Sequence, residues 1–229
     1  MSGLLMDAYE TRRPPPFAGA RAWLLGYAGA SLALLGVLGL LVSLRQGGPL
    51  GPDGLIQRWL LAARGPALTG AAHVLSFLGR YYVVGPLIAL VALCAWGLRE
   101  RRVGPGAVAM LMVGAWVELL KWGVGRSRPD VAGWLAEETG LAFPSGHAAG
   151  IAVLSLLAIV AGRRFLESGS GRAVREALLV ALAVGVGLSR VYLGVHYLSD
   201  VLAGWLLGAA WFSLCWWWVK GGDSARWRQ

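Results

Sequence analysis

Charged residues are scarce in this chain. Of its 229 residues only 14% are Asp, Glu, Lys or Arg, whereas 57% are hydrophobic, and the mean hydropathy is +0.60. A soluble domain of this length needs a charged surface, so the composition excludes one. It predicts an integral membrane protein with a single membrane domain.

Cysteine, lysine and histidine are rarer still. Cys94 and Cys215 lie in apolar runs far apart in the sequence, which predicts core or lipid-facing residues rather than a disulfide or a metal pair. The net charge is +9, but the basic residues form short clusters between apolar runs. This pattern is typical of membrane topology and argues against a nucleic-acid partner.

The apolar runs predict an all-α fold, a bundle of six transmembrane helices. A helix needs about 20 apolar residues to cross a bilayer. The runs lie at about 22–44, 81–98, 104–123, 144–162, 175–190 and 197–219. The stretch 45–80 contains glycines, prolines and amphipathic patches, which predicts one or two interfacial helices between spans one and two. The first run is too long for a signal-peptide core.

The distribution of basic residues predicts the orientation. With six spans, thirteen basic residues fall on the side of the termini and eight on the other. The positive-inside rule therefore predicts a cytoplasmic leader (1–21), one membrane domain (22–219) and a cytoplasmic tail (220–229). The oligomeric state of the protein is left open.

Three polar blocks interrupt the apolar sequence, and ionisable groups at the ends of spans are functional by default. The blocks are Lys121 with Arg128-Pro129, then Pro144-Ser145-Gly146-His147, then Ser189-Arg190 with His196 and Asp200. The alternation of span direction places all three on the outer face. This mixture of cations and imidazoles suits a phosphate group.

The cations provide the binding chemistry. Lys121 and Arg128 are seven residues apart, which is two turns on one face if the helix continues through both, with Pro129 marking its end. Arg190 adds a cation from another span. Guanidinium groups bind pairs of phosphate oxygens and lysine acts as a point charge, so together they neutralise charge in a transition state.

The second block opens a helix. Ser145 is a plausible cap, Gly146 allows close approach of the backbone, and the free N–H groups of a helix N-terminus bind anions. His147 would lie beside the bound phosphate, placed to protonate a leaving oxygen and later to activate water.

The third block predicts a nucleophile. His196 and Asp200 are four residues apart and would share a helix face. A carboxylate there keeps one imidazole nitrogen protonated and leaves the other free to attack phosphorus, giving a phosphohistidine. No metal or other cofactor is expected, because fixed cations neutralise the charge and the acidic residues do not cluster as in a magnesium site.

In this order, Lys-x6-Arg-Pro, Pro-Ser-Gly-His and Ser-Arg-x5-His-x3-Asp resemble the signature of the type-2 phosphatidic acid phosphatase superfamily, over roughly residues 80–210. The resemblance implies a six-span helical enzyme that hydrolyses lipid phosphate esters or diphosphates without metal. The small size of the chain resembles that of bacterial members, which implies a bacterial inner-membrane protein. In that family the His of the last block is the nucleophile and the His of Pro-Ser-Gly-His is the acid.

Several alternatives stay open. A phosphotransferase would share the intermediate and differ only in its acceptor. A transporter would instead place charges near the midplane of several spans. The substrate would be phosphatidylglycerol phosphate, phosphatidic acid, diacylglycerol diphosphate or undecaprenyl diphosphate. Glu118 either pairs with Lys121 or contacts substrate, and Arg126 either serves the site or binds lipid headgroups.

Overall fold

The computed structural model describes residues 18–97, 103–165 and 171–221, and every regular element within these ranges is helical. The helices are α2 (Ala18–Leu44), α3 (Gly51–Ala62), α4 (Pro66–Leu78), α5 (Tyr81–Gly97), α6 (Val103–Met110), α7 (Val113–Val124), η1 (Val131–Gly133), α8 (Gly146–Phe165), α9 (Gly171–Tyr192) and α10 (Leu198–Gly221). The all-α prediction is confirmed. Helices suit apolar segments in lipid because their backbone hydrogen bonds are satisfied internally.

Four helical stretches are long and apolar enough to cross a membrane: Arg21–Leu44, Gly106–Val124, Gly146–Arg163 and Leu198–Gly221. The pair α4 and α5, bent by 48° at its junction, would be a fifth. Helix α9 has 22 residues but includes Arg172, Arg175, Glu176 and Arg190. Its crossing, and with it the count of six spans, stays a prediction.

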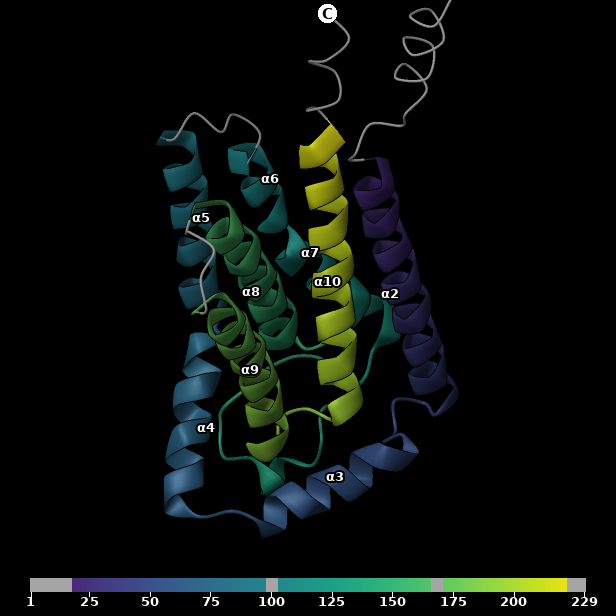
Figure 1. The fold of residues 1–229 in the computed structure, drawn as a ribbon. Coiled ribbons are helices and arrows are strands. Elements are labelled where there is room, and N and C mark those ends of the chain that lie inside the picture. Colours follow the sequence, from purple (N-terminus) through teal and green to yellow (C-terminus); the bar gives the residue numbers. More distant parts are fainter. Residues whose placement is uncertain (1–17, 98–102, 166–170, 222–229) are drawn as a thin grey trace, which may run out of the picture.

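The bundle brings the two ends of the described chain together. The first turn of α2 and the last turn of α10 lie at the same end, at the top of Figure 1. There the Arg21 guanidinium lies 4.9 Å from the ring centroid of Trp217. Helix α10 packs chiefly against α2 and α8. Most of the predicted leader (1–17) and tail (222–229) lies outside the described residues.

Two glycines of α10 let it approach α8 closely. A Cβ atom added at Gly204 would collide with the carbonyl oxygen of Ser145, and one added at Gly208 would lie 2.6 Å from that of Ala149. Small residues at a helix interface allow such backbone contact. This packing places the N-terminus of α8 beside the first turn of α10.

The helix does not continue from Lys121 through Arg128, so the condition for placing both on one helix face is not met. Helix α7 ends at Val124, where Gly125 adopts a left-handed conformation with φ of 67° and its N–H donates to the Lys121 carbonyl at 2.8 Å. A glycine tolerates this conformation and therefore ends helices. Arg128 consequently lies in the loop that leads to α8, and Pro129 does not mark a helix end.

The predicted third span (104–123) corresponds to the candidate span Gly106–Val124, in which a break separates the end of α6 at Met110 from the start of α7 at Val113. Between them the amides of Leu111 and Met112 bond three residues back, to Val108 and Ala109. Of the two helices found in 45–80, α3 lies across the lower end of the bundle in Figure 1, whereas α4 stands beside α9. The interfacial role of both helices stays a prediction.

Candidate active site

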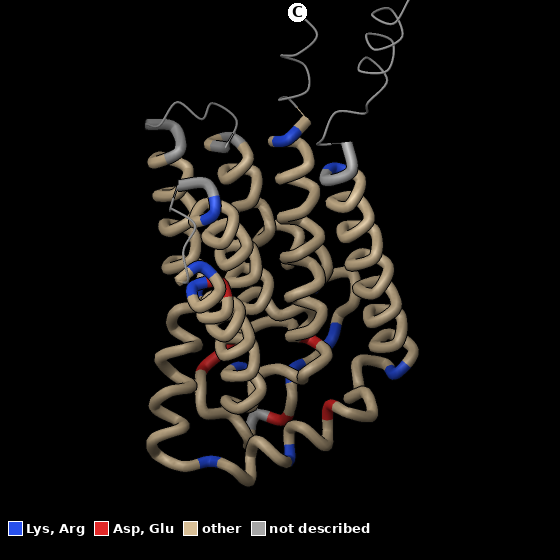
Figure 2. Tube along the Cα trace, in the orientation of Figure 1, with Lys and Arg blue, Asp and Glu red and all other residues tan. Residues whose placement is uncertain are grey.

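The three polar blocks meet at the end of the bundle opposite Ala18 and Gly221 (Figures 1 and 2). Each residue comes from a different place in the fold. His147 is in the first turn of α8, Arg190 in the last turns of α9, and Asp200 in the first turn of α10. The loops before α8 and α10 contribute Arg128 and His196. The structure thus brings together residues that are up to 72 positions apart, from Arg128 to Asp200.

His196 lies between Asp200 and Arg128. Its Nδ1 is 3.4 Å from Asp200 Oδ2, and its Nε2 is 3.1 Å from Arg128 Nη1. A guanidinium can only donate, so Nε2 is the unprotonated nitrogen, whose lone pair accepts from Arg128, and Nδ1 bears the proton. His196 precedes α10 instead of sharing a helix face with Asp200, as the spacing predicted, but the pairing itself is present.

The surroundings of His196 favour its neutral form. The side chain is only 2% exposed. Burial, followed by the charges of Arg128 and Arg190, holds the pKa of His196 well below its ordinary value of 6.5, and Lys121 contributes in the same direction. At neutral pH the imidazole therefore keeps the lone pair that a nucleophile requires.

Backbone carbonyls fix the guanidinium of Arg128. Its Nη1 donates to Val195 O at 3.0 Å, its Nη2 to Thr139 O at 3.0 Å, and its Nε to Gly140 O at 3.1 Å. The first of these carbonyls immediately precedes His196. Arg128 therefore ties the loop after α7 to the loop that bears the imidazole.

Arg190 is completely buried and lies between two polar partners that sequence reasoning missed. It donates to Ser76 Oγ at the end of α4 and to a carboxylate oxygen of Glu138. Glu138 also lies 3.5 Å from Arg128 Nη2. One carboxylate thus contacts both guanidinium groups, the geometry that a phosphate group would also satisfy.

The N-terminus of α8 presents two polar atoms without partners. Ser145 occupies the cap position, because its carbonyl accepts the Ala149 N–H at 3.1 Å, and its own N–H donates to Asp200 O at 2.9 Å. Its hydroxyl and His147 Nε2 are both buried, and neither has a hydrogen-bond partner among the described residues. The predicted cap is therefore correct in position, but the hydroxyl remains available to a ligand.

Lys121 lies on α7 and pairs with Glu118, its Nζ 2.8 Å from Oε1. Of the two alternatives for Glu118, the ion pair is the one observed. The charge of this lysine also lowers the pKa of His196, but less than the charges of Arg128 and Arg190 do, so its place in the cation cluster is peripheral.

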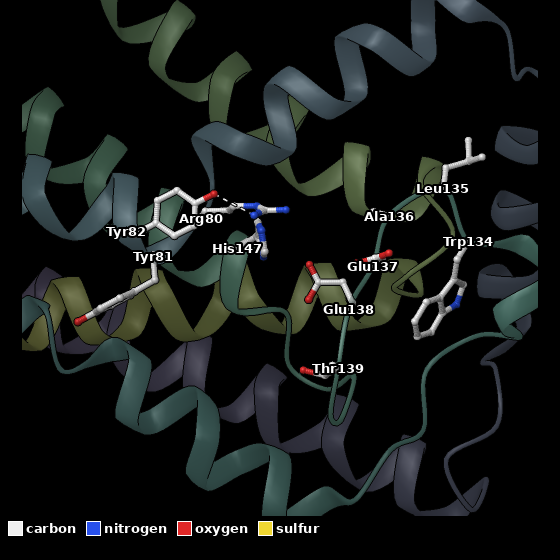
Figure 3. Close-up of a pocket in the computed structure, with 10 residues that line it drawn as sticks. All are labelled: Arg80, Tyr81, Tyr82, Trp134, Leu135, Ala136, Glu137, Glu138, Thr139 and His147. Atoms are coloured by element: carbon white, nitrogen blue, oxygen red, sulfur yellow. Dashed lines mark hydrogen bonds between the residues drawn. The ribbon is translucent and has the colours of Figure 1, made fainter.

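A pocket of about 1050 Å³ opens beside these residues. Its walls are the start of α5 (80–82), the loop segment 134–139 and His147. All three of Arg80, His147 and Glu138 line it, and Figure 3 shows the Glu138 carboxylate on the side toward His147. The imidazole of His147 therefore lines the same pocket as the carboxylate of Glu138.

Arg126 does not bind headgroups, because it is wholly buried. Its Nη1 lies 2.6 Å from Asp200 Oδ1 and its Nη2 lies 3.0 Å from Asp53 Oδ2. In the sequence, only its position two residues before Arg128 indicated that Arg126 could serve the site. Nothing in the sequence pointed to Asp53, which lies in the segment predicted to be interfacial.

Comparison with known proteins agrees with the fold and the motifs. Residues 104–222 match the model of the PAP2 superfamily. Phosphatidylglycerophosphatase B of Bacillus subtilis (strain 168) is 32% identical over 176 residues, covering 75% of this chain and 83% of that protein. Decaprenylphosphoryl-5-phosphoribose phosphatase of Mycobacterium tuberculosis (strain ATCC 25618 / H37Rv) is 33% identical over 147 residues, covering 63% of this chain and 76% of that protein.

A solved structure is also similar. The crystal structure of the first transmembrane PAP2 type phosphatidylglycerolphosphate phosphatase from Bacillus subtilis aligns with a TM-score of 0.72 and 25% identity, over 86% of this chain and 96% of that one. Fold and apolar composition define a membrane-embedded helical protein. The chain belongs to the PAP2 superfamily, as its motifs predicted, and is accordingly a lipid phosphatase.

Proposed function

We propose that this protein hydrolyses a phosphate monoester or diphosphate of a membrane lipid through a phosphohistidine on His196. One observation carries the proposal: the lone pair of His196 Nε2 points at Arg128, while Asp200 accepts from the opposite nitrogen. The nucleophile is thereby aimed at the place where a guanidinium would bind the phosphate.

The reaction then has two steps. Nε2 of His196 attacks phosphorus, the bond from phosphorus to the lipid oxygen breaks, and that oxygen takes a proton from His147. In the second step His147 removes a proton from water, which attacks the phosphohistidine and releases phosphate. Arg128, Arg190 and the N-terminus of α8 (Ser145-Gly146) neutralise the phosphoryl oxygens, with Lys121 nearby.

The substrate candidates are phosphatidylglycerol phosphate, phosphatidic acid, diacylglycerol diphosphate and undecaprenyl diphosphate. The names of the Bacillus subtilis relatives favour phosphatidylglycerol phosphate. We place the site on the periplasmic or extracellular face of a bacterial inner membrane, with six spans and both termini cytoplasmic, because the positive-inside rule favours that orientation. Fixed cations make the proposed chemistry independent of metal.

Purified protein in detergent tests this function directly. With chelator present, we expect inorganic phosphate release from at least one lipid of that panel at the rate seen without chelator, because fixed cations neutralise the charge. A requirement for added magnesium, or no release from any lipid, would contradict the proposal. Transfer of the phosphoryl group to an added alcohol in place of water would identify a phosphotransferase instead.

Replacing Glu138 tests the phosphate site. Its carboxylate contacts both Arg128 and Arg190, so it competes with the substrate phosphate for the same donors. We expect Glu138→Gln to lower KM, and the inhibition constant of inorganic phosphate, by about tenfold, which corresponds to ~1.4 kcal/mol. Glu137→Gln is the matched control, since Glu137 is an exposed residue on the same pocket wall. A KM that rises or stays constant in Glu138→Gln counts against a phosphate between these arginines.

A further inference from the structure

Arg126 is saturated by protein acceptors. Its Nε donates to Gly47 O at 3.1 Å, and its Nη2 donates to Gly48 O and to Asp53 Oδ2, both at 3.0 Å. Its Nη1 donates to Ser199 Oγ and to Asp200 Oδ1, both at 2.6 Å. A guanidinium has five N–H donors, and these five bonds use them all. Arg126 therefore has no donor left for a phosphate.

The carboxylate of Asp53 likewise accepts hydrogen bonds from several protein groups. Its Oδ1 accepts the Ser199 N–H at 2.8 Å, and its Oδ2 accepts the Ser199 hydroxyl at 2.6 Å as well as the bond from Arg126. The Leu50 N–H also donates to Oδ2, at 2.9 Å. Asp53 thus joins α3 to the first turn of α10, immediately before Asp200, although α3 is distant in sequence.

The two carboxylate oxygens of Asp200 contact different groups. Oδ1 accepts from Arg126, whereas Oδ2 faces His196 Nδ1 and accepts the Tyr197 N–H at 2.8 Å. The ring of Tyr197 lies 4.3 Å from the Arg126 guanidinium carbon. Arg126 and the Tyr197 N–H therefore both orient the carboxylate that faces His196, and Asp53 is one of the acceptors that hold Arg126 in place.

We propose that Asp53 and Arg126 are positioning residues for the reaction, which hold Asp200 so that one oxygen stays on His196. The proposal rests on the proposed function of His196. When Nε2 bonds to phosphorus, the imidazole becomes cationic, and Asp200 Oδ2 stabilises that charge. Arg126 is paired with two carboxylates, those of Asp53 and Asp200. Because Asp53 neutralises part of the guanidinium charge, more of the negative charge of Asp200 remains to stabilise the imidazole.

Asp53→Asn tests this role, because it removes the charge and keeps the size. We expect kcat to fall about 10–100-fold, the effect typical of removing a residue that orients a functional histidine's partner, while KM stays constant because Asp53 does not touch substrate. In the Asp200→Asn background the same substitution should change kcat less than twofold. The control is Asp130→Asn, an exposed loop carboxylate, which should leave both constants unchanged.

A purely structural role predicts a different pattern. Asp53→Asn would then lower kcat by the same factor in both backgrounds, through a smaller active fraction, and that result would overturn the proposal. Should Asp53→Asn not yield monodisperse protein, Ser199→Ala removes the hydroxyl shared by Asp53 and Arg126. We expect Ser199→Ala to lower kcat by a smaller factor and to leave KM unchanged. Equal losses of kcat in the wild-type and Asp200→Asn backgrounds would again overturn the proposal.

A second readout does not depend on lipid turnover. The chain has three histidines, so the NMR spectrum of protein labelled with 15N-histidine is simple, and loss of one signal in His196→Gln assigns the Nδ1–H of His196. We expect Asp53→Asn to shift that signal. An unchanged signal would contradict the positioning role. A shifted signal in a protein that hydrolyses no lipid would leave that role standing while the proposed function fails.

Discussion

His196→Ala should reduce phosphate release to background. The substitution removes the atom that forms the bond to phosphorus, and loss of a nucleophile or its base in comparable sites lowers kcat by about 10⁴-fold or more, which corresponds to ~5.5 kcal/mol. Substrate binding should persist, since the proposed phosphate ligands Arg128 and Arg190 remain. The measurements are kcat on the preferred lipid and the affinity for inorganic phosphate.

The chain offers a matched control in His73→Ala, because His73 is exposed on α4. That variant should retain the activity of the wild type. A brief reaction with 32P-labelled substrate, quenched in alkali, should label wild-type protein and His73→Ala but not His196→Ala. Turnover by His196→Ala near the wild-type rate would exclude the phosphohistidine.

His147→Ala should separate the two chemical steps. Its Nε2 is buried without a partner among the described residues, beside the pocket that leads to the imidazole (Figure 3). A lipid alkoxide is a poor leaving group and needs a proton, so release from lipid should fall by about 10²–10⁴-fold. Nitrophenolate leaves without a proton, so the first step on nitrophenyl phosphate should be affected much less.

The second step still needs His147 as a base. His147→Ala should therefore give a burst of about one nitrophenolate per active site, followed by slow turnover, as a phosphohistidine accumulates. Rapid mixing with nitrophenyl phosphate measures the burst. Equal losses in the first step on the lipid and on the aryl ester would argue against His147 as the acid.

The local patterns of the sequence were sufficient for the class of fold and the family. Long apolar runs require helices in a membrane, because the backbone has no other partners there, and the described chain is helical. The three motifs identified the PAP2 superfamily, which the comparisons confirm. The ion pair of Lys121 with Glu118 was one of two alternatives, since residues three apart on a helix are neighbours.

The spacing of the motif residues left open whether they share one helix. The spacing of Lys121 and Arg128 fits a continuous helix, yet Gly125 ends α7 before Arg128. The left-handed conformation of one glycine decides the outcome, and a glycine inside an apolar segment is equally compatible with helix. The spacing of His196 and Asp200 likewise fits one helix face, whereas His196 lies two residues before the start of α10.

The sequence alone determined which residues are the candidates for the chemistry, because cations and imidazoles are costly at the end of an apolar span and stand out there. Only the tertiary structure decided what holds them. Asp53 on α3 reaches Arg126, and Glu138 lies between two arginines, although these partners are at least ten residues apart. Such long-range pairings depend on how the helices pack, for which no spacing along the chain is a signal.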